Sequence, residues 1–485
     1  MKQVYWMLSL SVLIGVVGVG RAAHAQPTIP REEIPSDLSV EVREEYETLY
    51  SSDPQQRAVA VMHLEPPFGV RPEGPEISFL MAMLHDDAVV CDEEELQRRR
   101  MLSSYIGLFG LGSDIPNSPG QQAASALGRS AARWGTPTSD ELLALLANDK
   151  PAVRANAARA LGAMAREINI ETGPKGFQVP LVSEALLGLL HDEQPQVRLD
   201  AVKALGEIVD MGPSGHKKAS PAVLAAFVDA LEDDHTEVRK CAAIMLRVLA
   251  EPSTVEPLIE VVRSDESPEV RQTAARALQE IGDPRAVDVL IEVLEDPQQD
   301  VDVRREVAEA LGKTGDDRAI EPLITALNDP DWQVRIGALA VTDVLRDYHV
   351  LRPLLIDRLQ DEDWQVRDIA ARRVMKLGEL KDPEAFSVLA TALSDGQPNV
   401  RASVVTSLGM LKDRRAVPLL IGALQRDDNS YVRWHAARAL GELGDARAVG
   451  PLQAIEADEN EDEIVRSQAR TALEKFNNAV RSGQL

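Results

Sequence analysis

Basic residues are scarce in this 485-residue sequence relative to acidic ones. Lysine and arginine together number 52 against 78 aspartates and glutamates, which gives a formal net charge of −26. Such an acidic surface repels phosphate backbones, so a nucleic-acid partner is disfavoured and basic proteins or cations are favoured. Aromatic residues are also few, at 4%, although 44% of the residues are hydrophobic. Many of the apolar residues are alanine, leucine and valine, and small or straight-chain residues suit closely packed helices.

Long apolar runs are absent beyond the N-terminus. The sequence begins with Lys2, continues with an apolar stretch at residues 7–20 and then reads Ala23-His24-Ala25. The stretch is shorter than the about 20 residues that a membrane-spanning helix needs. A basic start, a short apolar core and an A-x-A site are typical of a secretory signal peptide. We therefore expect residues 1–25 to be a signal peptide, cleaved near Ala25-Gln26.

The mature protein is then expected to be exported, either periplasmic or secreted. An uncleaved anchor is the alternative. No cysteine directly follows the expected cleavage site, so a lipid anchor is not predicted, and no later apolar run is long enough to insert stably into a membrane.

The dipeptide Val-Arg recurs along the chain at intervals of about 32 residues, which is the length of one helix pair in a repeat protein. Its arginines are Arg154, Arg198, Arg239, Arg271, Arg304, Arg335, Arg367, Arg401, Arg433 and Arg466. An Asp often lies six residues before the Arg, and an Ala three residues after it. Val, Ala, Ala and Leu then fall at i, i+4, i+7 and i+8, which predicts one apolar stripe of an amphipathic helix.

The ends of these helices are marked by glycine and by Asp-Pro. The Val-Arg helix often ends in Gly, as at Gly282, Gly315 and Gly444, because glycine accepts the left-handed conformation that closes a helix. Asp283-Pro284 then supplies an N-cap and a first-turn proline for the next helix. The predicted unit is helix A, a tight turn, helix B with the Val-Arg dipeptide, and a second turn.

These residues carry a family resemblance. Segments such as 265–282 and 427–444 repeat the pattern D-x4-VR-x2-A in register. They resemble HEAT repeats of the phycobilisome-lyase-like type, over roughly residues 139–476. The resemblance implies an all-α fold, a right-handed alpha-alpha superhelix (HEAT-repeat solenoid), with the A helices on the convex side and the B helices on the concave side.

The predicted organisation is an array of about ten helix pairs at residues 139–485, preceded by degenerate repeats at residues 26–138 that cap it. Two intervals between successive Val-Arg dipeptides are longer than the others. They predict inserted loops at residues 167–180 and 209–220, which contain Gly-Pro dipeptides. Insertions at equivalent places emerge on one side of a solenoid, often the binding side. Tolerated variation in length is an equally good interpretation.

The recurring Asp and Arg are predicted to form a structural ladder. The Asp would accept hydrogen bonds from backbone N–H groups of its turn, and the Arg would bridge to that Asp or to the Asp of the next repeat. The pairs are Asp265 with Arg271, Asp329 with Arg335, Asp361 with Arg367, Asp395 with Arg401, and Asp427 with Arg433. Recurrence in most units is expected of a structural element rather than of a binding site.

Motifs of enzymes and metal sites are not found. The HEAT-repeat enzyme deoxyhypusine hydroxylase is recognised by His-Glu pairs that bind two irons, and this sequence has no His-Glu dipeptide; its matching helix reads Trp434-His435-Ala436. Zinc-ligand spacings and phosphate-binding glycine motifs are also missing. The acidic run at residues 456–463 lacks the EF-hand spacing, so a solvated loop is favoured over a calcium site. The sequence predicts no catalytic residue, no metal and no cofactor.

Two tryptophans occupy the same position in consecutive units. Trp332 and Trp364 each lie three residues before the ladder Arg, and each follows an aspartate, Asp331 or Asp363. Equivalent points in stacked helix pairs are about 10 Å apart. Two indoles at this spacing, beside Asp331 and Asp363, form a candidate binding site for a basic segment. The alternative is that each indole covers the end of its own helix pair.

The leading functional hypothesis is an exported scaffold that mediates protein–protein interactions through an acidic solenoid surface, and that is not an enzyme. The alternative is an accessory enzyme or a chromophore- or metal-handling protein, bilin lyase-like or deoxyhypusine hydroxylase-like. Bilin lyases act on pigments in the cytoplasm, whereas this chain carries an export signal, so the resemblance to them is one of repeat type.

Overall fold

The computed structural model describes residues 138–167, 179–211 and 217–481, together with parts of residues 47–63 and the positions 83, 121, 123, 124 and 127. The expected signal peptide lies outside the described residues, as do most of the predicted cap at residues 26–138 and of the insertion at residues 167–180. The chain divides into two compact units, Met1–Met245 and Leu246–Leu485. Among the described helices, none combines the length and apolar character that crossing a bilayer requires.

The described part of the first unit is a series of helix pairs. Its helices are α3 (Pro54–His63), α7 (Thr138–Leu145), α8 (Pro151–Glu167), α9 (Val179–Leu189), α10 (Pro195–Ile208), α11 (Pro221–Asp229) and the first ten residues of α12 (Thr236–Leu249). Helix α7 packs on α8, α9 packs on α10, and α8 packs on α10. The stripe positions of α8 and α10, among them Val153, Leu161, Val197 and Leu205, are fully buried.

The predicted loop at residues 209–220 is wrong at its two ends. There β1 (Asp210–Met211) and β2 (Lys217–Lys218) pair antiparallel, with Asp210 opposite Lys218 and Met211 opposite Lys217. The pairing gives backbone N–H and C=O groups partners where the insertion leaves and rejoins the helical array. The Gly212-Pro213 dipeptide that indicated a loop lies between the two strands.

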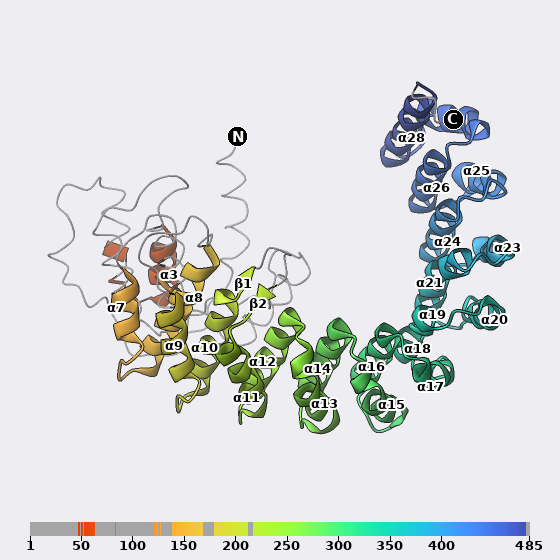
Figure 1. The fold of residues 1–485 in the computed structure, drawn as a ribbon. Helices are drawn as coiled ribbons and strands as arrows, with labels where there is room; N and C mark the ends of the chain where they lie inside the picture. Colours follow the sequence, from red (N-terminus) through yellow and green to blue (C-terminus); the bar gives the residue numbers. More distant parts are fainter. Residues whose placement is uncertain are drawn as a thin grey trace. The chain divides into compact units, whose positions relative to one another are not determined.

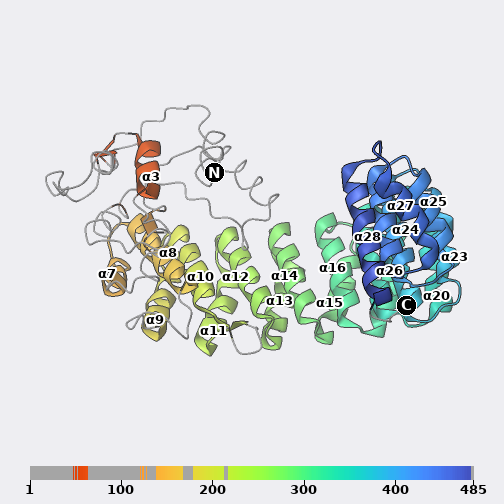
Figure 2. The same cartoon turned by 90° about the horizontal axis from the view of Figure 1, so that it is seen from above.

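The second unit consists of helix pairs in two layers (Figures 1 and 2). The A helices are α13 (Val255–Ser264), α15 (Val287–Glu295), α17 (Ile320–Ala326), α20 (Tyr348–Arg358), α23 (Ala385–Thr391), α25 (Ala416–Arg426) and α27 (Val449–Ala457). The B helices are α14 (Pro268–Ile281), α16 (Val301–Thr314), α18 (Trp332–Ala338) with α19 (Val341–Val344), α21 (Trp364–Arg373) with α22 (Met375–Glu379), α24 (Pro398–Met410), α26 (Ser430–Leu443) and α28 (Glu463–Arg481). The predicted all-α solenoid is confirmed.

The helix boundaries follow the sequence signals. Helix α14 ends at Gly282 with φ 64°, and α26 ends at Gly444 with φ 63°. Both glycines adopt the left-handed conformation that a side chain disfavours. Asp283 then accepts a hydrogen bond from the backbone N–H of Arg285 and caps a short 3₁₀ turn, Pro284–Ala286, that leads into α15.

The B helices of the second unit pack closely on one another. A Cβ on Gly409 of α24 would lie 2.7 Å from the Cβ of Ala439 on α26, and a Cβ on Gly441 would lie 2.7 Å from that of Ala472 on α28. Only glycine allows the backbones to approach this far. Within this unit the B helices lie on the inner side of the bend and the A helices on the outer side (Figure 1), as the family resemblance implies.

Candidate functional site

Most of the described A-to-B turns are organised by an aspartate that precedes the B helix, and the turn before α8 uses Asn148 in the same way. The Asp361 Oδ1 atom accepts from the backbone N of Asp363 at 3.0 Å, and Asp329 Oδ1 accepts from the backbone N of Asp331 at 2.9 Å. The same contact forms at Asp265, Asp395 and Asp427, where the acceptor distances are 2.8, 2.8 and 3.0 Å. A carboxylate that binds its own turn in this way replaces a missing backbone partner.

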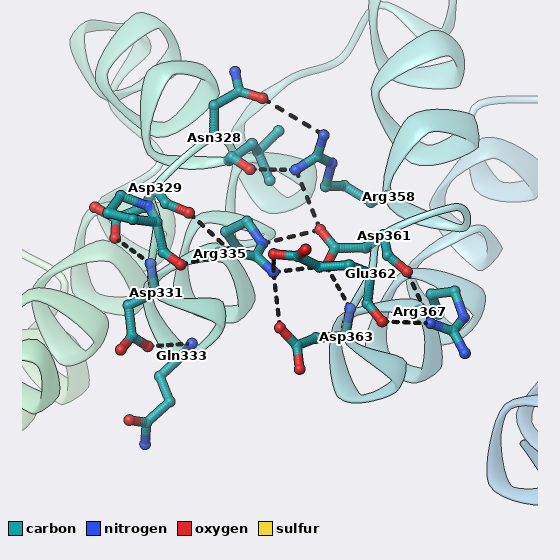
Figure 3. Close-up of polar contacts among 12 residues, drawn as sticks. Asn328, Asp329, Asp331, Gln333, Arg335, Arg358, Asp361, Glu362, Asp363 and Arg367 are labelled. Carbon is teal, nitrogen blue, oxygen red and sulfur yellow. Dashed lines mark hydrogen bonds and ion pairs between the residues drawn. The ribbon is translucent and has the colours of Figure 1, made fainter.

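The arginine six residues later joins this turn to the next repeat (Figure 3). Arg335 Nη1 donates to the backbone oxygen of Asp329 at 3.0 Å, and its Nε and Nη2 atoms donate to the Asp361 carboxylate at 2.9 and 2.7 Å. The side chains of Arg335 and Asp361 are only 6% and 4% exposed. One guanidinium therefore fixes the backbone of its own turn and makes a two-pronged ion pair with the following turn.

The other ladder arginines repeat this arrangement. Arg367 pairs with Asp395 at 2.7 and 3.1 Å, Arg401 with Asp427 at 2.8 and 2.8 Å, and Arg433 with Glu461 at 2.8 and 2.6 Å. In the first unit, Arg154 pairs with Asp192, and Arg198 with Asp233. The structure thus brings each of these arginines to the next repeat's carboxylate, and to the backbone of its own turn.

Arg271 differs from the rungs described above. Its Nη1 donates to the backbone oxygen of its own Asp265 at 2.6 Å, but its Nε donates to the amide oxygen of Gln299 at 2.9 Å. The next turn has a different sequence, in which Asp300 caps α16 through the backbone N of Asp302 at 2.9 Å. The acceptor that reaches Arg271 is therefore neutral.

The ion pairs shift the protonation of the ladder. Burial alone would raise the pKa of Asp395, but hydrogen bonds from Arg367 and from the backbone of Gln397 lower it below its usual value. The hydrogen bond from Arg154 lowers the pKa of Asp192 against the effect of its burial. The carboxylates of these rungs are held ionised.

Carboxylates outnumber arginines along the A-to-B turns, which we call the acidic edge. Arg335 lies 3.1 Å from Asp363 and 3.7 Å from Glu362 in addition to its main partner, and the Glu362 side chain is 84% exposed. Arg401 also pairs with Asp428, which is 89% exposed. At these two rungs one guanidinium faces two or more carboxylates, some of them exposed, so the edge carries a net negative charge there.

The two tryptophans begin neighbouring B helices at this edge. Trp332 is the first residue of α18 and Trp364 the first residue of α21, and both are half-buried. Asp331 caps α18 by accepting from the backbone N of Gln333 at 2.8 Å. Asp363 occupies the same position before α21, but its carboxylate accepts from Arg335 at 3.1 Å and makes no capping bond.

The prediction that the acidic run at residues 456–463 is a solvated loop is only partly right. Glu461 is only 8% exposed at its side chain and receives the hydrogen bonds of Arg433. Glu456 pairs with Arg470 at 3.0 Å. Through Glu461, the run therefore supplies the carboxylate that pairs with Arg433. In the described part of the chain, no group of three or more His, Cys, Asp or Glu side chains is arranged to hold a metal ion.

A second set of contacts between repeats was missed by the sequence analysis. It joins consecutive B helices, through a residue five positions after one ladder Arg and a residue two positions after the next. Arg159 pairs with Asp200 at 2.8 Å, Arg276 with Glu306 at 2.6 Å, and Thr406 lies 2.8 Å from His435. These contacts could have been predicted from polar residues at the position two residues after the ladder Arg, which faces the neighbouring B helix. Asp200 and Glu306 occupy this position and are buried.

A third set, also missed, closes the B-to-A turns with the pattern D-x-R-A. Asp283, Asp316, Asp413 and Asp445 each accept from the backbone and side chain of the arginine two residues later. The hydrogen bond from Arg447 lowers the pKa of Asp445 to about 2. The signal was visible in the sequence, because the pattern recurs at one point of four units.

Two family models of HEAT repeats match this chain. The model described as "HEAT repeats" matches residues 224–302, 255–343, 320–397, 352–433 and 387–474, and the model described as "HEAT repeat" matches residues 182–211. Together the matches cover more than half of the chain. The predicted resemblance is confirmed.

Sequence relatives share only part of their length with this chain. Deoxyhypusine hydroxylase of Rattus norvegicus is 31% identical over 88 residues, 18% of this chain and 29% of that protein. "Uncharacterized phycocyanin operon protein Z" of Pseudanabaena tenuis is 31% identical over 129 residues, 26% of this chain and 63% of that protein. Bilin biosynthesis protein PecE of a Nostoc species is 37% identical over 84 residues, covering 16% and 33%. The chain spans less than two thirds of each of these relatives.

Solved structures show similarity in fold alone. A Kap95:Nup1 complex matches with a TM-score of 0.57 at 16% identity, over 94% of this chain and 68% of that one. A structure of importin beta matches with a TM-score of 0.54 at 15% identity, over 90% and 67%.

Proposed function

Since the chain belongs to the HEAT-repeat proteins, we propose that it is a binding scaffold that holds a protein partner along its acidic edge. The observation that carries this proposal is the excess of exposed carboxylates over arginines at the A-to-B turns, beside two half-buried tryptophans at equivalent positions. Arg335 and Arg401 each carry one positive charge but contact two or more carboxylates, and of these Glu362 and Asp428 are 84% and 89% exposed. A repeated, rigid surface with this charge favours an extended basic segment.

The two tryptophans would supply the anchor of this site. Trp332 and Trp364 begin α18 and α21, and both residues are half-buried. An indole face attracts a lysine or arginine side chain, most strongly where carboxylates stand beside it, as Asp331 and Asp363 do here. If the indoles only cover the ends of their helix pairs, the acidic edge would bind without them.

Export is part of the proposal. The basic start, short apolar core and A-x-A site at residues 1–25 favour secretion, which places the partner outside the cytoplasm. Mass spectrometry of the mature protein tests this, with Gln26 expected as its first residue. A chain that keeps Lys2 after expression in its native host would contradict it.

An accessory enzyme is the second candidate, favoured by the partial similarity to deoxyhypusine hydroxylase and PecE. It is the weaker one because the sequence lacks the His-Glu pairs by which that hydroxylase is recognised. The two candidates predict different purified proteins. A coloured protein, or one with stoichiometric iron by elemental analysis, would favour the enzyme.

Charge reversal on the edge tests the scaffold proposal. We expect the wild-type chain to capture one stoichiometric protein partner from the extracytoplasmic fraction, through a basic region, with an affinity that falls as salt rises. Glu362→Lys should weaken this complex. Glu260→Lys, at a site on α13 where the side chain is 64% exposed, is the matched control and should leave it unchanged. Equal affinity of both variants would contradict binding at the edge.

A further inference from the structure

Exposed apolar side chains lie at the acidic edge a second time, in the last two repeats of the second unit. Tyr431 is 50% exposed and Ile464 is 54% exposed. Each is the second residue of a B helix, α26 or α28, and lies two residues before the ladder Arg. The backbone N of Tyr431 donates to Asn429 Oδ1 at 2.9 Å, and that of Ile464 to Asp462 Oδ1 at 3.1 Å. The two residues therefore occupy equivalent places in neighbouring turns.

The same position is polar in the preceding B helices. From α10 to α24 it is held by Gln196, Glu237, Glu269, Asp302, Gln333, Gln365 and Asn399. Stacking of the repeats therefore does not require an apolar side chain at this position. A single exposed apolar residue is ordinary, but two in the same register of adjacent, packed helices favour an interaction site.

The Tyr431 ring is held against its own helix, although the residue is half exposed. Its centre lies 4.5 Å from that of the His435 ring, one turn along α26, in an edge-on arrangement with an interplanar angle of 79°. A side chain held in this way loses little freedom when a ligand packs on it. Arg438, further along the same helix, donates to Glu442 at 3.0 Å, so this pair adds no net positive charge near Tyr431.

The turn before α28 carries unbalanced negative charge. Residues 458–463 contain five carboxylates and no basic residue. Two of them, Glu461 and Glu463, pair with the arginines Arg433 and Arg466. The other three are exposed and form no ion pair in the described part of the chain: Asp458, Glu459 and Asp462. The charge beside Ile464 therefore selects a basic occupant even after the existing ion pairs are counted.

This apolar pair lies two repeats beyond Trp364. The B helices α21, α24, α26 and α28 pack on one another in this order (Figure 1). Since packed helices are about 10 Å apart, Trp364 and Tyr431 are about 20 Å apart along the edge, which about six residues of extended chain span. The turn between them, before α24, has a single carboxylate, Asp395, which is 9% exposed and pairs with Arg367.

We propose that one extended basic segment of the protein partner binds the acidic edge at two points. Its apolar residues fall into two groups, about six residues apart. One group packs on Trp332 and Trp364, and the other on Tyr431 and Ile464, while lysines or arginines beside each group face the exposed carboxylates. This two-point attachment rests on the proposed function and adds the length and the residue pattern of the segment.

Selection of peptides on the full-length chain tests two-point binding. A phage library of random peptides of about 16 residues, long enough to reach both points, is selected on the wild-type protein, and enriched peptides are measured by fluorescence anisotropy. We expect basic peptides with two apolar groups. Tyr431→Ser/Ile464→Ser should weaken their binding about tenfold, which is about 1.4 kcal/mol. Val350→Ser/Ile356→Ser, which removes two apolar side chains of α20 that are 42% and 38% exposed, is the matched control and should leave binding unchanged.

A lysine placed between the two points gives a test that leaves both apolar pairs intact. Gly396 lies in the turn before α24, where an added Cβ would meet nothing within 4 Å, so Gly396→Lys should fold with an unchanged melting temperature. It should weaken a basic peptide that crosses this turn. Gly422→Lys on α25, where a Cβ also meets nothing within 4 Å, is the control and should bind as the wild type does.

Failure of two-point binding can be told apart from failure of the edge as a site. Basic peptides that bind Tyr431→Ser/Ile464→Ser and Gly396→Lys as tightly as the wild type would overturn two-point binding. If these peptides still lose affinity for Trp332→Ala/Trp364→Ala, the edge remains a site with one point of attachment. A selection that enriches no basic peptide would overturn both proposals.

Discussion

Two series of aspartate–arginine pairs run through the same chain, and their surroundings differ. In the ladder, Arg335 and Asp361 come from consecutive repeats, with side chains 6% and 4% exposed. In the B-to-A turns, Arg285 pairs with Asp283 only two residues away, with side chains 48% and 19% exposed. The residue types and hydrogen-bond distances are alike, but one pair joins repeats in a nearly dry interface and the other closes a local turn in water.

Burial decides what each series does. An ion pair in solvent contributes little to stability because water screens it, and each side chain loses freedom when it is held. A buried pair contributes little over an apolar alternative, but removing one partner leaves a charge without solvent or counter-charge. The ladder is therefore the series in which a single substitution should damage the fold.

The largest effect is expected from Arg335→Ala. It takes the two-pronged partner from the buried Asp361 carboxylate, which keeps only its longer 3.4 Å contact with Arg358, and it removes the hydrogen bond to the backbone of Asp329. We expect a loss of about 3 kcal/mol in the free energy of unfolding, measured by urea denaturation followed by circular dichroism. Arg285→Ala is the control from the turn series and should destabilise far less. Unfolding of the Arg335 and Arg285 variants at the same urea concentration would contradict the expected difference in stability.

Arg271→Ala should have an intermediate effect. Its partner in the next repeat is the neutral amide of Gln299, so no buried carboxylate is left behind. A loss of about 1 kcal/mol is expected, as for a typical hydrogen bond. Asp265→Ala should also destabilise the fold, because it removes the acceptor of the Ser267 backbone N. Either substitution leaving stability intact while abolishing partner binding would show that this part of the ladder is a site.

Acid should act on both series in the same direction. The pKa of Asp395 is lowered in the ladder and that of Asp445, at about 2, in the turns. An aspartate with a folded pKa below its unfolded value near 3.9 binds fewer protons in the folded state. The stability it contributes is present above about pH 4 and is lost as pH falls toward 2. Asp445→Asn should flatten this decline in urea titrations at several pH values, and an unchanged slope would contradict the assigned pair.

The smallest expected effect concerns His435. Burial, Arg438 and Arg372 lower its pKa, so the folded state binds a proton less readily than the unfolded chain. Stability should then begin to fall as pH drops below about 6.5, the usual pKa of histidine. His435→Gln removes the titrating group and should remove this shallow decline. Wild-type melting temperatures that stay constant from neutral pH down to the acid transition would refute it.

Much of the fold could be predicted from the sequence because its determinants are local. Helix stripes, the glycine ends and the Asp-Pro cap depend on residues within one repeat, and Gly282 and Gly444 end their helices as expected. The partners of the ladder arginines depend on stacking, so the choice between the own and the next Asp stayed open. The contact of Thr406 with His435 joins residues from two B helices and is set by helix rotation, which the sequence pattern does not specify.

The candidate site was only partly predictable for the same reason. Trp332 and Trp364 share a register, and both begin a B helix as their position indicated. Asp331 and Asp363 looked equivalent, yet Asp331 caps its helix, whereas Asp363 makes no capping bond and accepts from Arg335 of the preceding repeat. Equivalent sequence positions in a repeat therefore do not guarantee equivalent contacts.

The central claim is that the acidic edge with its two tryptophans is a binding surface rather than only a structural seam. The most direct measurement is the affinity of the captured partner for the wild-type chain and for the double variant Trp332→Ala/Trp364→Ala, with melting curves of both. Met410→Ala, at the C-terminal end of α24 where the residue is 53% exposed, is the control. We predict that the double variant loses at least tenfold in affinity, about 1.4 kcal/mol, at an unchanged melting temperature. Undiminished affinity of the double variant would contradict the claim.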